Sequence, residues 1–115
     1  LALSLSDTVH KISSDQRLHL HLAAVFANNF TNHMYYLANK ICEEKAIPFS
    51  TLESLIKETT HKITTSKPFD VQTGPAKRRD TSIIKKHLEL LQHSKHQEIY
   101  SLLSESIQDT YGNEL

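Results

Sequence analysis

Three asparagines and a histidine lie close together in the first third of the chain: His21, Asn28, Asn29 and Asn32. An asparagine amide can donate hydrogen bonds to a substrate oxygen, and a histidine can exchange a proton near neutral pH. The four surround an apolar run, LAAVFA, and polar side chains are costly to bury there without partners. These residues are therefore the candidate catalytic group of the sequence.

One long helix would position this group. The stretch Ser14–Lys45 contains neither Gly nor Pro, and its middle is apolar on every side, as in a helix buried between others. At about 100° per residue, four polar residues fall on one stripe of such a helix: His21, Asn28, Asn32 and Asn39. The stripe is either the solvent side of the helix or the wall of a cleft. Asn29 points about 80° away from it and is expected to be the most buried asparagine.

The segment Lys67–Arg79, KPFDVQTGPAKRR, is the second candidate site and is expected to be an extended loop. It ends in three basic residues, just before a helix that Asp80 can cap. Backbone donors, a positive helix end and guanidinium groups can hold a phosphate or carboxylate. The candidate substrate- or cofactor-binding residues are Gln72, Thr73, Gly74, Arg78 and Asp80. The alternative is a turn fixed by an interaction between Arg78 and Asp80.

The rest of the chain predicts four more helices. One ends near Ser13, one begins at Ser50, one is capped by Asp80, and one opens with a capping box of Ser94 and Gln97. No segment alternates long enough to be a strand. The predicted fold is all-α, with about five helices around the long central helix.

Charge and composition restrict the function. Lys and Arg together number 13, as do Asp and Glu, and this balance argues against a nucleic-acid or anionic-membrane partner. The single Cys42 excludes an internal disulfide and a Cys-rich zinc site, and it suits a reducing cytosol. His19 and His21 diverge by about 200° on a helix, so they cannot share a metal ion. We expect a cytoplasmic protein that has no metal site and no membrane span.

Several segments together resemble the C-terminal domain of the Rossmann-like proteins that contain a DUF2520 domain: LHLAAVFANNFTNHMY, FSTLESLIKET, QTGPAKRRD and IIKKHLELL. The resemblance covers nearly the whole chain, and QTGPA with Arg78 and Asp80 is its most specific part. It implies that residues 1–115 form a single helical domain, similar to the C-terminal domain of the 6-phosphogluconate dehydrogenase superfamily. It also implies an N-terminal Rossmann domain, absent from this sequence, that would bind NAD(P), so that the helical part alone needs no cofactor.

The same resemblance points to a missing lysine. β-Hydroxyacid dehydrogenases of that superfamily carry a catalytic lysine in a K-x-x-N-N pattern, and the matching stretch here has Val25 before Asn28 and Asn29. Ketopantoate reductases space Lys, Asn and Asn four apart, which places Ala24 where the lysine belongs. Because both registers lack the general acid, His21 is the nearby candidate for proton transfer.

The resemblance therefore leaves two functions open. The first is the substrate-side and dimerisation domain of an NAD(P)-dependent oxidoreductase, inactive alone, which closes the active-site cleft and forms a homodimer. The second is a non-catalytic dimerisation module of a dinucleotide-binding sensor protein. Whether the full-length protein is an enzyme is open at this point.

Overall fold

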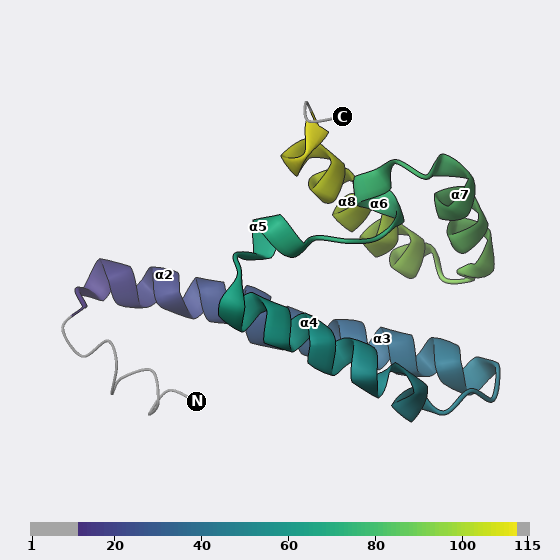
Figure 1. The fold of residues 1–115 in the computed structure, drawn as a ribbon, viewed down its shortest axis with the longest axis horizontal. Helices are drawn as coiled ribbons and strands as arrows, with labels where there is room; N and C mark the ends of the chain where they lie inside the picture. Colours follow the sequence, from purple (N-terminus) through teal and green to yellow (C-terminus); the bar gives the residue numbers. More distant parts are fainter. Residues whose placement is uncertain (1–11, 113–115) are drawn as a thin grey trace. The chain divides into compact units, whose positions relative to one another are not determined.

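The computed structural model describes residues 12–112, and within this range every regular element is helical (Figure 1). The elements in chain order are α2 (Ser14–Ala24), η1 (Val25–Phe30), α3 (Thr31–Glu44), η2 (Phe49–Leu52), α4 (Glu53–Thr65), α5 (Pro68–Val71), α6 (Pro75–Arg78), α7 (Thr81–Leu90) and α8 (Ser94–Thr110). The predicted all-α fold is confirmed. The short helix predicted before Ser13 lies outside the described residues. Contacts divide the chain into two compact units, Leu1–Leu55 and Ile56–Leu115.

The long helix runs without a break through α2, η1 and α3, close to the predicted bounds. It begins with a reciprocal capping box, in which the Ser13 hydroxyl accepts from the Gln16 N–H at 3.1 Å and the Gln16 side chain accepts from the Ser13 N–H at 2.9 Å. It ends with Ala46 in the left-handed region at φ 56. The Ile47 N–H then donates to the Cys42 carbonyl at 2.9 Å, which is the closing bond of a Schellman motif.

The middle of the long helix is not α-helical. Val25–Phe30 forms the π-helical turn η1, whose backbone bonds span five residues instead of four. Such a turn inserts about one residue, which rotates the following helix by about 100° relative to the preceding one. The single polar stripe predicted for a straight α-helix therefore does not continue from His21 to Asn32 and Asn39.

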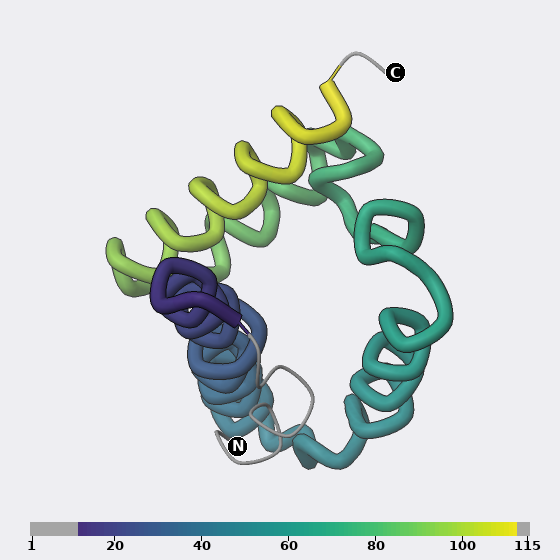
Figure 2. Tube along the Cα trace, turned by 90° about the vertical axis from the view of Figure 1, so that its left-hand side faces the viewer, coloured from purple at the N-terminus to yellow at the C-terminus, as the bar shows by residue number. Residues whose placement is uncertain are grey.

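In the second unit, α7 and α8 lie side by side (Figure 2). The Gln97 side chain donates to the carbonyls of Leu88, at 3.2 Å, and Leu91, at 2.7 Å, and so closes the end of α7. The predicted capping box of Ser94 and Gln97 is therefore wrong, because Gln97 is used by the neighbouring helix. His87 Nδ1 and the Tyr100 hydroxyl form a further link at 2.7 Å, and burial raises the pKa of Tyr100.

The predicted loop Lys67–Arg79 is also corrected, because it contains the short helices α5 and α6. Each begins with a proline, whose fixed φ and missing N–H suit the first turn of a helix. Gly74 stands between them at φ 105 and ψ 169, a conformation that side-chain-bearing residues rarely adopt. None of the helices in the described part of the chain is long and apolar enough to cross a membrane.

Candidate functional site

The three candidate asparagines of the long helix are all exposed. Their side chains form no hydrogen bond within residues 12–112, so the amides of Asn28, Asn29 and Asn32 are available to a ligand or a partner. The prediction that Asn29 is buried is wrong. Its apolar neighbours Leu22 and Phe26 are themselves more than half exposed, at 55% and 63%, and offer no packed face for Asn29 to enter.

His21 and Arg17 lie together one turn apart in α2. They line a shallow hollow of about 390 Å³ with Ser14 and Leu18. A guanidinium can bind a carboxylate or phosphate, and an imidazole can exchange a proton near neutral pH. The hollow therefore places the guanidinium of Arg17, a group that can bind an anion, next to His21, the predicted proton-transfer residue.

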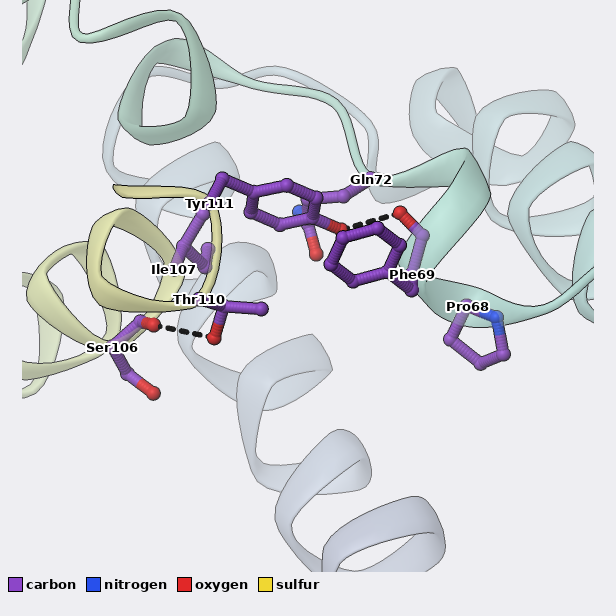
Figure 3. Close-up of a pocket in the computed structure, with 7 residues that line it drawn as sticks. All are labelled: Pro68, Phe69, Gln72, Ser106, Ile107, Thr110 and Tyr111. Atoms are coloured by element: carbon purple, nitrogen blue, oxygen red, sulfur yellow. Dashed lines mark hydrogen bonds between the residues drawn. The ribbon is translucent and has the colours of Figure 1, made fainter. Parts of the chain in front are cut away.

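The segment that carries QTGPAKRRD is fastened to the end of α8 through Tyr111, which is only 4% exposed. Its ring stacks on Phe69 with centroids 4.6 Å apart, and its hydroxyl donates to the Phe69 carbonyl at 2.5 Å (Figure 3). Lys77 Nζ lies 4.9 Å from the centroid of the same ring, in a cation–π contact. Arg79 donates from Nη2 to the Gln108 carbonyl at 3.1 Å. These contacts brace α5 and α6 against α8.

Tyr111 and Phe69 were not among the predicted site residues. A signal for Tyr111 is present, because it lies four residues after Ile107, which the sequence places on the inward face of the last helix. The partner of Tyr111 is 42 residues away along the chain, and no local pattern identifies it.

A second hollow, of about 260 Å³, lies beside Tyr111 (Figure 3). Its lining residues come from α5, the following turn and α8: Pro68, Phe69, Gln72, Ser106, Ile107, Thr110 and Tyr111. Of the predicted binding residues, Gln72 is the one that lines it, and the Gln72 side chain donates to the Thr73 carbonyl at 3.0 Å. Thr73 and Arg78 are exposed. Gly74 provides the positive-φ backbone between α5 and α6.

Asp80 holds the start of α7. Its Oδ1 accepts from the Ile83 N–H at 3.3 Å and from the Ser82 hydroxyl at 3.1 Å. The carboxylate therefore occupies the position in which an external anion would meet this helix end. Arg78 makes no ion pair with Asp80 within the described residues, so the alternative of a turn fixed by these two residues is not observed. The neighbouring Arg79 makes the bracing contact, to the Gln108 carbonyl.

Asp80→Ala is expected to lower the free energy of unfolding by about 1 kcal/mol, because the cap bond to the Ile83 N–H is lost. Asp80→Asn keeps an acceptor oxygen and is expected to lose less. Urea denaturation followed by circular dichroism measures both values. An Asn variant as unstable as the Ala variant would show that the charge, rather than the cap bond, stabilises this helix end.

Comparisons with known proteins agree with the fold. Residues 1–107 match the sequence model of a family described as a domain of unknown function, DUF2520. A crystal structure from Bacteroides fragilis, of a protein named as a candidate NADP oxidoreductase, matches with a TM-score of 0.84 and 45% sequence identity. The match covers 86% of this chain and 39% of that chain, so the present chain spans well under half of its relative. No curated protein matches the chain. Since the family model matches nearly the whole chain, the chain belongs to the DUF2520 family.

Proposed function

We propose that this chain is the helical, substrate-side domain of an NADP-dependent oxidoreductase and that it is inactive alone. The observation that carries the proposal is the match to the Bacteroides fragilis protein, at 45% identity and with a TM-score of 0.84. The relative is more than twice as long, which leaves room for a domain that binds most of the dinucleotide. The single unpaired Cys42 supports a cytoplasmic protein.

The long helix supplies the groups that the proposal needs. The exposed amides of Asn28 and Asn29, which lie inside η1, would donate to the substrate or to the nicotinamide carboxamide, whereas η1 turns Asn32 out of line with His21. His21 would give the substrate oxygen the proton that accompanies hydride transfer from NADPH, and Arg17 in the same hollow would attract an acidic substrate. The substrate class that fits these groups is a small oxo acid.

A second function has support from one observation. Val25 and Ala24 occupy the two positions at which related reductases would carry a lysine, so the general acid is missing. A dinucleotide-binding sensor that uses this domain only for self-association would need no such acid.

NADPH oxidation by the full-length protein, tested against a panel of small oxo acids, separates the two functions. His21→Ala is expected to lower kcat by about 100-fold, because general acid–base groups contribute at least that much. His19→Ala is the matched control, since the His19 ring is held by the Asp15 carbonyl at 2.8 Å and does not line the hollow. Unchanged turnover in His21→Ala removes His21 from the mechanism. Binding of NADPH without turnover of any oxo acid favours the sensor.

We also propose that the full-length protein is a homodimer and that the long helix contributes to its interface. Four large apolar residues, spaced one turn apart on this helix, form an apolar stripe: Leu18, Leu22, Phe26 and Phe30. They are 67%, 55%, 63% and 51% exposed. An exposed stripe of this kind is typical of a surface that meets a partner.

A further inference from the structure

The π-helical turn η1 coincides with the asparagine pair. It spans Val25–Phe30, and Asn28 and Asn29 lie inside it, while the residues on both sides are regular α-helix. Turns of this kind are rare and are often found at functional sites. A widened turn changes the direction of the side chains that it carries, so whatever maintains η1 also sets the orientation of these amides.

One side chain is suited to maintain the turn. The Thr31 hydroxyl donates to the Phe26 carbonyl at 3.2 Å, five residues earlier, which is the same step as a π-helical backbone bond. Four threonines of α4 and α8 bond to carbonyls three or four residues earlier, as is usual in an α-helix: Thr60, Thr64, Thr65 and Thr110. The Thr31 bond therefore fits the wide turn and would not form in the same way on a regular α-helix.

The rings beside the turn support the same geometry. Phe26 and Phe30 meet edge to face, with centroids 5.1 Å apart. Phe26 thus takes part in two contacts across η1, through its carbonyl to Thr31 and through its ring to Phe30. Both contacts span the segment that contains Asn28 and Asn29.

We infer that Thr31 is a positioning residue: its hydroxyl bond to the Phe26 carbonyl holds η1 in the π-helical form and so orients the amides of Asn28 and Asn29 toward the bound ligand. The part of this inference that concerns the ligand rests on the proposed function. The part that concerns the turn rests on the geometry alone.

The test compares Thr31→Val, which keeps the shape but lacks the hydroxyl, with Thr31→Ser, which keeps the hydroxyl. Thr60→Val is the matched control, because it removes an equivalent bond, to the Ile56 carbonyl at 2.9 Å, far along the chain. Backbone chemical shifts of residues 25–31 in the labelled full-length protein report the turn. NADPH-induced shifts of the asparagine side-chain amides report its consequence.

Thr31→Val is expected to change the backbone shifts of residues 25–31 and to lose the NADPH-induced shifts of Asn28 and Asn29. Thr31→Ser and Thr60→Val are expected to behave like the wild type. Wild-type backbone shifts in Thr31→Val overturn the inference. If NADPH binds without moving the asparagine signals of the wild type, the proposed function fails, and the backbone shifts still decide whether Thr31 holds the turn.

Discussion

Tyr111→Ala is expected to lower the free energy of unfolding of the Ile56–Leu115 unit by about 3 kcal/mol, the usual scale for removing a buried aromatic ring. Tyr111 is 4% exposed and is the point at which α5, α6 and α8 meet. The substitution removes the stacking on Phe69, the hydroxyl bond to the Phe69 carbonyl and the contact with Lys77. It leaves a cavity between α5, α6 and the end of α8.

Two further variants separate the contributions of this side chain. Tyr111→Phe keeps the ring and loses the hydroxyl bond to the Phe69 carbonyl, so we expect a loss of about 1 kcal/mol. Tyr36→Ala removes a tyrosine that is 54% exposed and is expected to cost less than about 1 kcal/mol. Urea denaturation and amide exchange of the full-length protein measure all three variants. If Tyr111→Ala costs no more than Tyr36→Ala, Tyr111 does not anchor this unit.

The Tyr111 anchor also links stability to the candidate binding residues. Gln72 and Gly74 lie on the turn between α5, which carries Phe69, and α6, which carries Lys77. A loss of ligand affinity in Tyr111→Ala would therefore follow from movement of this turn. It would not show that the ring itself contacts a ligand.

The features that the sequence predicted correctly depend on neighbouring residues. The capping box of Ser13 and Gln16 and the Asp80 cap each span three residues, so a short pattern contains both partners. The absence of Gly and Pro from Ser14 to Lys45 likewise predicts an unbroken helix, because those residues are the strongest helix breakers. These local rules were sufficient for the all-α fold and the long helix.

The features that the sequence did not predict are of two kinds. Some depend on a small difference in free energy between two local conformations, and others depend on partners far along the chain. Nothing in VFANNF distinguishes a π-helical turn from an α-helical one, and the change moves Asn32 out of line with His21. The Ser94 and Gln97 pair fits the capping pattern as well as Ser13 and Gln16 do, yet Gln97 bonds to the end of α7. Periodicity could place Tyr111 on an inward face, but not opposite Phe69.

The largest effect on assembly is expected from the double substitution Leu22→Asp and Phe26→Asp in the apolar stripe. Burying carboxylates without partners is strongly unfavourable, and a two-fold symmetric interface contains each substitution twice. We therefore expect the affinity of the proposed dimer to fall by at least about 100-fold, a loss of roughly 2.7 kcal/mol. Sedimentation velocity of the full-length protein at several concentrations measures the change.

Leu90→Asp is the matched control, because Leu90 is 72% exposed but lies on α7 and not on the long helix. A wild-type protein that sediments as a monomer at micromolar concentrations contradicts the dimer, and dissociation by Leu90→Asp alone would place the interface on α7.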